Sequence, residues 1–115
     1  MSVEIDLLGH PVHEMARELL RRRSVSIRGR LQVSWLGAYD FTPEQTSAMA
    51  DSVAQELRAH VSATRPRAVH IMCATPADFA TLLGHRLTAL EADIQLYERS
   101  ADVYAPSLLI PAELP

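Results

Sequence analysis

The sequence is poor in residues that several classes of small protein depend on. It has 115 residues but only one cysteine, Cys73, so an intrachain disulfide is impossible and a reducing compartment is expected. All eleven basic residues are arginine, and the net charge is −3, which argues against a polybasic protein with DNA as its partner. Aromatic residues make up only 5% of the chain, too few for a platform that stacks a single strand.

Glycine-rich and metal-binding patterns are also scarce. With four glycines, the chain has neither a phosphate-binding loop nor a dinucleotide fingerprint, and no serine lies in a nucleophile elbow. His10 and His13 are three residues apart, but no third ligand follows at a recognisable spacing, so we expect no metal and no cofactor. His70 and Cys73 point to opposite faces of one predicted strand, so we assign no catalytic residue.

Long apolar runs and targeting signals are missing as well. No hydrophobic segment approaches the roughly 20 residues of a membrane span. The first ten residues lack the basic region of a signal peptide. Hydrophobic residues nevertheless make up 48% of the chain, enough for a core without disulfides or metal. We therefore expect a single cytoplasmic domain over residues 1–115, with no membrane partner.

The most informative stretch runs from Arg67 to Arg99. Its apolar residues are nearly continuous over Ala68–Ala74, as expected for a strand covered on both faces. Thr75 then predicts a helix cap, with Pro76 at the first helical position, and a second strand follows over Ile94–Tyr97. The predicted buried stripe of this helix is Phe79, Leu82, Leu83, Leu87 and Leu90. A strand, a helix and a parallel strand form a right-handed crossover unit.

Strands and helices alternate through the rest of the chain. We expect a strand over Val3–Leu8, a helix after Pro11, a strand over Val25–Trp35 and a helix from Thr42 to about Ala63. Pro106 restricts Val103–Ile110 to an edge strand or an extended tail. Gly29 interrupts the second of these strands, either as a bulge in one long strand, which we favour, or as part of a hairpin turn. This order predicts an α/β fold, a single Rossmann-like three-layer domain with a mostly parallel sheet.

A candidate ligand site follows from that fold. Ligands of parallel sheets bind beyond the carboxyl ends of the strands, where helix N-termini point free N–H groups at anions. We call the edge of the sheet formed by these carboxyl ends the rim. Trp35 ends its strand at the rim, where it either packs at the edge of the fold or stacks on a nucleobase. The candidate ligand-binding residues are Gly9, His10, Trp35, Thr75, Pro76, Ala77, Tyr97, Glu98 and Arg99.

The same stretch resembles the C-terminal part of SAVED domains. The resemblance is carried by the run HIMCATPADFATLLGHRL, residues 70–87, followed by IQLYE, residues 94–98. In that family a strand ends in a small residue before proline, the next helix carries a glycine before a polar or basic residue, and a later strand ends in Tyr-Glu or Tyr-Asp. SAVED domains are bacterial sensors of cyclic oligonucleotides in CBASS and CRISPR anti-phage defence, related to the Rossmann-like CARF sensors.

The resemblance implies a ligand and partners. The ligand would be a cyclic tri- or tetranucleotide, and the partners would be further copies of the chain and a separate effector protein. A full SAVED domain has about two Rossmann-like halves, so this chain resembles a half-SAVED domain whose pocket another protomer or subunit would complete. Arg99 would supply charge, and Tyr97 or Trp35 would stack on a base.

Three hypotheses remain open at this point. The leading one is a sensor subunit that binds a cyclic oligonucleotide, assembles into oligomers and activates a separate effector. The alternative is an assembly subunit that binds a partner protein but no nucleotide, through the arginine face of the Val25–Trp35 strand, with Arg28 and Arg30, and the edge at Pro106. The third is an enzyme, a ring nuclease that degrades the signal.

Overall fold

Strands and helices alternate along the computed structural model, which describes residues 1–23, 25, 27, 29–35, 37, 40–87, 90–100 and 103–112. The elements in this part of the chain are β1 (Ser2–Asp6), α1 (Val12–Arg22), β2 (Arg30–Ser34), α2 (Pro43–Thr64), β3 (Ala68–Ala74), α3 (Ala77–Arg86), β4 (Asp93–Ser100) and β5 (Val103–Ile110). None of the helices described there is long and apolar enough to cross a membrane.

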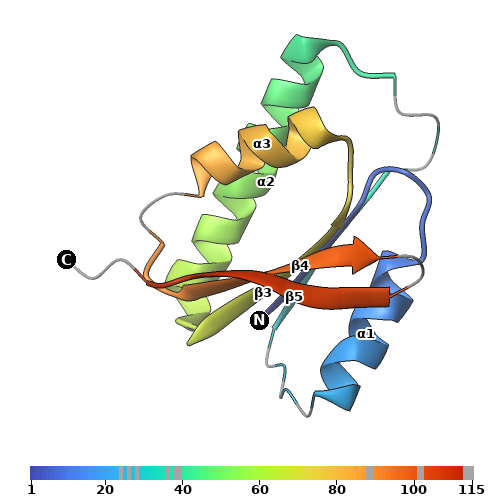
Figure 1. The fold of residues 1–115 in the computed structure, drawn as a ribbon. Helices are drawn as coiled ribbons and strands as arrows, with labels where there is room; N and C mark the ends of the chain where they lie inside the picture. The colour runs from blue at the N-terminus through green and yellow to red at the C-terminus, as the bar shows by residue number, and fades with distance from the viewer. Residues whose placement is uncertain are drawn as a thin grey trace.

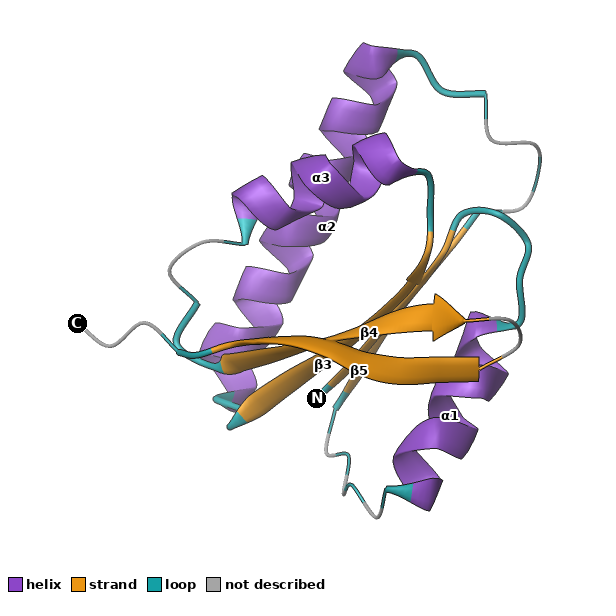
Figure 2. Cartoon of the chain, in the orientation of Figure 1, coloured by secondary structure: helices purple, strands orange, loops and turns teal. Residues whose placement is uncertain are grey.

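The strands form one sheet in the order β2-β1-β3-β4-β5. The pairs β1–β2, β1–β3 and β3–β4 are parallel, and β5 runs antiparallel to β4 at one edge. Helix α1 covers one face of the sheet, and α2 and α3 lie together on the other (Figures 1 and 2). The prediction of a three-layer α/β fold with a mostly parallel sheet is therefore confirmed.

Two apolar cores hold the layers together, one on each face of the sheet. On the α2/α3 side, the odd-numbered residues of β1 (Val3 and Ile5) pack with Leu57 of α2 and Phe79 of α3, all fully buried. On the other side, Val12, Ala16 and Leu20 of α1 pack against the sheet with Met72 and Tyr104. The buried residues of α1 recur at helical spacing, so one face of this helix meets the sheet.

The start of α2 was predicted correctly from local sequence. The Thr42 side chain accepts a hydrogen bond from the backbone N–H of Gln45 (3.2 Å), and the Gln45 side chain accepts one from the backbone N–H of Thr42 (2.9 Å). Pro43 occupies the first turn, and the helix ends at Thr64, close to the predicted end at Ala63.

Proline also defines the edge strand as predicted. Leu96 pairs with Leu108 and Tyr97 with Pro106, so Ser107 is an extra residue in β5. Its hydroxyl donates to the backbone carbonyl of Leu96 (3.2 Å). Because proline has no N–H to donate to a ladder, an edge strand with a bulge is the place where it is tolerated.

Four details of the predicted elements were wrong. Thr75 does not cap α3, because the chain stays extended through Pro76 (ψ 152°), and no side chain accepts a hydrogen bond at that cap. The same helix ends at Arg86, so Leu87 and Leu90 contact the core from beyond it. Strand β2 covers only Arg30–Ser34 rather than Val25–Trp35, and β4 continues past Tyr97 to Ser100. The predicted polar face of the Val25–Trp35 segment included Arg28, which lies outside the described residues.

We expect the capping box of α2 to contribute measurably to stability. Thr42→Ala removes the acceptor for the Gln45 N–H and should lower the free energy of unfolding by about 1 kcal/mol in a urea titration. Ser52→Ala, at an exposed position in the middle of the same helix, is the matched control and should leave stability unchanged or slightly higher, since alanine favours helix. Equal effects of the two substitutions would contradict the proposed role of the cap.

Candidate functional site

The carboxyl ends of β1 and β3 meet at the topological switch point of the sheet. From β1 the chain crosses to β2 on one side, and from β3 it crosses to β4 on the other, so the two connections leave in opposite directions. This is the place where open parallel sheets form a ligand crevice. The two strand ends are tied together, because the Leu7 N–H donates to the Ala74 carbonyl (2.9 Å).

In the β1–α1 loop, which holds Gly9 and His10, the backbone N–H groups donate hydrogen bonds to a side chain of the same chain. Asp6 Oδ1 accepts hydrogen bonds from the backbone N–H groups of Leu8 (3.2 Å), Gly9 (2.8 Å) and His10 (3.0 Å). Gly9 has a φ of +74°, a left-handed conformation that glycine adopts without strain. The expected anion contacts of Gly9 and His10 are thus occupied by a carboxylate of the same chain, which sequence analysis did not foresee.

The β3–α3 loop forms the other wall of the switch point, with Thr75, Pro76 and Ala77. Its turn leads directly into the first turn of α3, where the Asp78 carboxylate accepts from the Phe79 N–H (2.9 Å). The Ala80 N–H donates to the Pro76 carbonyl (3.2 Å). The positive end of the α3 dipole therefore faces this rim, as predicted, although one of its amides is already paired.

Trp35 lies at the same rim, directly after β2. Its backbone N–H donates to the Asp6 carbonyl (3.0 Å), which fixes it beside the end of β1. The side chain is 39% exposed, and its ring packs edge-on against Phe41 at a centroid distance of 4.8 Å. Trp35 therefore packs at the edge of the fold on one side, and a substantial part of the residue still reaches solvent.

Tyr97 does not reach the rim. Its side chain is buried on the α1 side of the sheet, and its hydroxyl lies 2.8 Å from Nδ1 of His70. Burial raises the pKa of Tyr97 and lowers that of His70, so the pair is held as neutral phenol and neutral imidazole. The expected stacking role of Tyr97 fails in this conformation because β4 runs three residues beyond it to Ser100.

Arg99 lies nearer the end of β4, paired across the ladder with Tyr104. The Tyr104 hydroxyl donates to the Cys73 carbonyl (3.0 Å), and burial raises the pKa of that phenol to about 12, an effect that the positive charge of Arg99 opposes. Arg99 thus brings positive charge to the strand ends near β3. The Glu98 side chain, also among the expected site residues, lies outside the described part of the structure.

A buried carboxylate beneath the rim was missed from the sequence. Glu4, in the middle of β1, is fully buried and accepts hydrogen bonds from the Ser2 hydroxyl (2.5 Å) and the Gln32 amide (3.2 Å). Arg30 Nε lies 3.0 Å from its Oε2, and His13 Nδ1 lies 3.4 Å from its Oε1. Helix α1 covers the face of β1 that carries Glu4, which is why this carboxylate is shielded from water.

His13 extends this cluster to the rim. Its Nε2 lies 2.8 Å from the hydroxyl of Ser34, the last residue of β2. His13 thereby connects the first turn of α1 with the strand end that carries Trp35. Neither His13 nor Ser34 was assigned to the site from the sequence, because the contact joins residues 21 positions apart.

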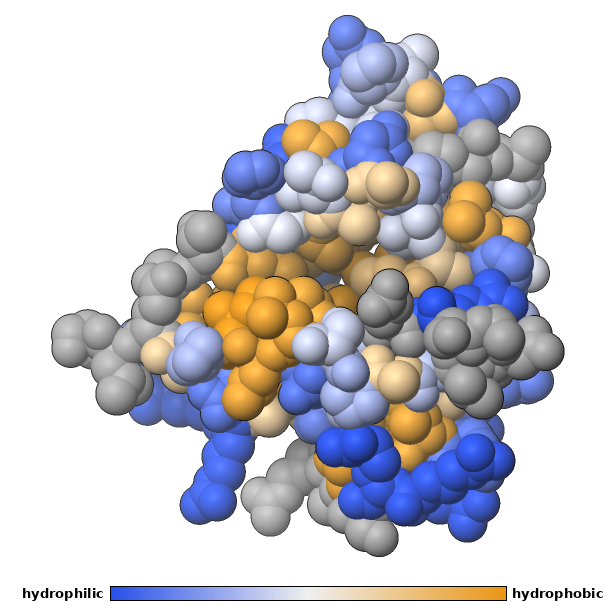
Figure 3. All heavy atoms as spheres, viewed as in Figure 1, coloured by the Kyte–Doolittle hydropathy of each residue, from blue (hydrophilic) through white to orange (hydrophobic). Residues whose placement is uncertain are grey.

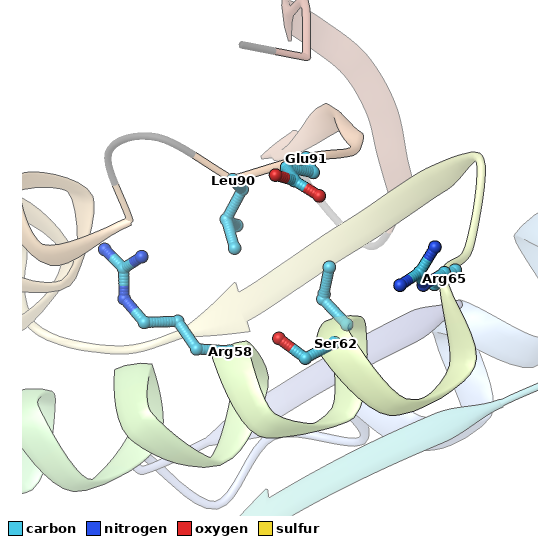
Figure 4. A pocket seen from close by; sticks show the side chains of 6 residues that line it. Arg58, Ser62, Arg65, Leu90 and Glu91 are labelled. Carbon is cyan, nitrogen blue, oxygen red and sulfur yellow. The ribbon is translucent and has the colours of Figure 1, made fainter. Parts of the chain in front are cut away.

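Two surface hollows lie at the opposite end of the sheet. One, of about 370 Å³, is lined by Arg58, Val61, Ser62, Arg65, Leu90 and Glu91, from α2 and the segment before β4 (Figure 4). The other, of about 580 Å³, lies where Pro66, Ala68 and His70 meet Met1 and Gly29. Since both lie toward the amino ends of the strands, neither is formed by the residues at the switch point.

The side chains and helix end at the rim are of the kinds that contact organic or anionic ligands rather than metal ions. Within the part of the chain that the structure describes, no group of three histidine, cysteine or carboxylate side chains could hold a metal ion. The rim combines a partly exposed indole, the amino end of a helix and an arginine. Together with the switch point, these features define a small Rossmann-like domain with a rim whose chemistry suits an anionic or aromatic ligand.

The family of this domain follows from its sequence. The family model for SAVED, the SMODS-associated and fused to various effectors sensor domain, matches residues 40–110, more than half of the chain. The chain therefore belongs to the SAVED family, which confirms the resemblance seen in the sequence. No curated protein sequence matches the chain.

Solved structures agree with this assignment at the level of the fold. The Acinetobacter baumannii Cap4 SAVED/CARF-domain containing receptor is similar at a TM-score of 0.72 and 20% identity, over 95% of this chain and 24% of that one. The same receptor with the cyclic trinucleotide 2'3'3'-cAAA is similar at 0.68 and 23%, with the same coverage. The Moraxella osloensis Cap4 receptor is similar at 0.59 and 22%, over 94% of this chain and 21% of that one. The chain thus spans about a quarter of the length of these receptors.

The Glu4 cluster gives a stability prediction. Arg30→Met removes the cation from a fully buried carboxylate and should lower the free energy of unfolding by roughly 2–4 kcal/mol, because an unpaired buried charge is strongly unfavourable. Arg22→Met is the matched control. Arg22 pairs with Glu18 at the exposed surface, so its loss should change stability far less than Arg30→Met.

The double variant Glu4→Met/Arg30→Met isolates the cause of this effect. It should recover much of the loss, since no buried charge then remains. Chemical denaturation of the natural sequence, Arg30→Met, Arg22→Met and the double variant measures these differences in the free energy of unfolding. A double variant that is less stable than Arg30→Met would show that Glu4 contributes through its hydrogen bonds rather than through its charge pair.

Proposed function

We propose that this chain is a sensor domain for cyclic oligonucleotides in bacterial anti-phage defence. The observation that carries the proposal is the match to the SAVED sensor family over residues 40–110. It is supported by the likeness of the fold to a Cap4 receptor that was solved with the cyclic trinucleotides 3'3'3'-cAAA and 2'3'3'-cAAA. A cyclic trinucleotide or tetranucleotide is accordingly the proposed ligand.

The proposed site is the rim around the switch point. Trp35 stacks on a base, because its ring is partly exposed and is braced from one side by Phe41. Phosphate groups lie toward the Thr75-Pro76-Ala77 turn and the amino end of α3, with Arg99 as the nearby cation. The Asp6 carboxylate disfavours a phosphate at Gly9 and His10, so these two residues contact the ribose or base rather than the phosphate.

The rim of one chain forms only part of the proposed site. It is an edge of a domain measuring 35 × 33 × 21 Å, and a cyclic oligonucleotide lying on it would leave its other face in water. We therefore propose a half-SAVED domain whose rim is completed by a second protomer or another subunit. Ligand binding would then drive assembly and activate a separate effector protein.

The single tryptophan provides a direct test of the site. Titration with 3'3'3'-cAAA, 2'3'3'-cAAA and cyclic di- and tetranucleotides should quench Trp35 fluorescence for at least one ligand, because a stacked base quenches an indole. Sedimentation of the same mixtures reports assembly. The absence of any change in fluorescence, thermal stability or sedimentation at high concentrations of every ligand would overturn the proposal.

Two matched pairs of variants then locate the site. Trp35→Ala should weaken binding at least tenfold, whereas Leu109→Ala, an exposed apolar residue at the other end of the sheet, should not. Arg99→Gln should weaken binding and its salt dependence, whereas Arg22→Gln, which changes the net charge equally, should not. Binding that survives both site variants would place the ligand elsewhere, with the basic hollow near Arg58 as the next candidate.

A further inference from the structure

The second half of β5 carries an apolar patch that the described fold leaves uncovered. Leu108, Leu109 and Ile110 are 56%, 55% and 41% exposed, although all three are large hydrophobic residues. Figure 3 shows hydrophobic side chains gathered over β5 on this face of the molecule. Leu108 and Ile110 lie opposite Leu96 and Ile94, which pack in the α2/α3-side core, so the patch continues an existing apolar surface. We call Leu108–Ile110 the edge patch.

The edge patch lacks the features that normally keep an edge strand unpaired. Strand β5 ends the sheet, so its outer row of N–H and C=O groups faces away from the other four strands. Exposed edges are usually protected by charged side chains, yet none of the eight residues of β5 is charged. Its one protective feature, Pro106 with the adjacent bulge, lies before the edge patch and leaves Leu108–Ile110 regular.

We propose that the edge patch pairs with the same patch of a second copy of this chain, antiparallel and around a two-fold axis at Leu109. In this register Leu108 of each copy lies opposite Ile110 of the other, so four apolar side chains meet on one face of the joined sheet. Leu109 meets its own symmetry mate on the opposite face. Pairing an uncharged strand with itself brings no like charges together.

The positions of Pro106 and Pro111 agree with this register. With Leu109 on the axis, Ser107 lies opposite Pro111 of the second copy, and Pro106 lies beyond the paired segment. The prolines thus flank the pairing and limit it to the segment with the exposed leucines. The other edge strand, β2, fits self-pairing less well, because its first residue is the charged Arg30 and its two apolar residues, Leu31 and Val33, are already partly buried in the core.

This interface does not depend on the proposed function. Leu108–Ile110 pair with Ile94–Leu96 at the beginning of β4, whereas the rim lies beyond the strand's other end. Pairing should therefore occur without any nucleotide. A failure of nucleotide binding would leave this interface intact, and a failure of pairing would leave the rim intact.

The first experiment measures the mass of the purified chain in solution by sedimentation equilibrium, without nucleotide. We expect a dimer at micromolar concentrations, and at least a tenfold weaker dimer for Leu108→Lys and for Ile110→Lys. Leu8→Lys is the matched control, since Leu8 is 45% exposed but lies on the β1–α1 loop, and it should dimerise like the natural sequence. A monomer up to 100 μM, or an open-ended polymer, would overturn the proposal.

The second experiment tests the register by cross-linking. Leu109→Cys places two thiols at the axis and should give a covalent dimer under mild oxidation, whereas Ser52→Cys, exposed on α2, should not. The native Cys73 does not interfere, because burial raises the pKa of its thiol to about 12 and leaves little reactive thiolate. Equal cross-linking of the two variants would indicate random collision and would contradict the two-fold axis at Leu109.

Discussion

Burial of β1 between β2 and β3 is the constraint on which the rest of the structure depends. Its odd-numbered residues close the α2/α3-side core and its even-numbered residues face α1, so Ser2 to Ile5 are all fully buried. Glu4 is buried by this arrangement and requires the cation of Arg30, which fixes the register of β2 against β1. Because β2 is held in this way, its end places Trp35 beside Asp6 at the switch point. The geometry of the rim is thus a consequence of how the central strand is paired.

Features set by local sequence could be predicted, and features set by contacts distant in sequence could not. The start of α2 at Thr42 and the edge position of the strand with Pro106 depend on residues a few positions apart, and both were predicted correctly. The order of strands and helices gave the fold and the position of the rim. Tyr97 was misplaced because the length of β4 depends on its pairing with β5, which no periodicity reveals. The Asp6 and His13 contacts were missed because a short polar side chain gives no pattern that identifies its partner.

The rim is electrostatically uneven, and this bears on any anionic ligand. Asp6 fills the amide nest of the β1–α1 loop with a negative charge, whereas the β3–α3 loop presents a helix N-terminus and lies closer to Arg99. A phosphate would therefore gain more at the β3 side of the switch point than at the β1 side. The partly exposed indole lies on the β1 side, next to the Asp6 backbone. Such a division places phosphates and bases at different strand ends, and it favours one orientation of a ring on the rim.

The edge pairing and the rim together constrain the form of any assembly. In an antiparallel pair of β5 strands, β4 of one copy runs opposite to β4 of the other. Since each rim lies at the carboxyl end of its parallel strands, the two rims of a dimer face in opposite directions. Among copies of this chain, only one from a different dimer could then enclose a nucleotide on one rim, because the paired copy faces away. Closed pairing at the edge and ligand-bridged contact at the rims would alternate along the assembly, and such alternation has no intrinsic limit. A sensor built in this way would grow in steps of whole dimers as ligand is added.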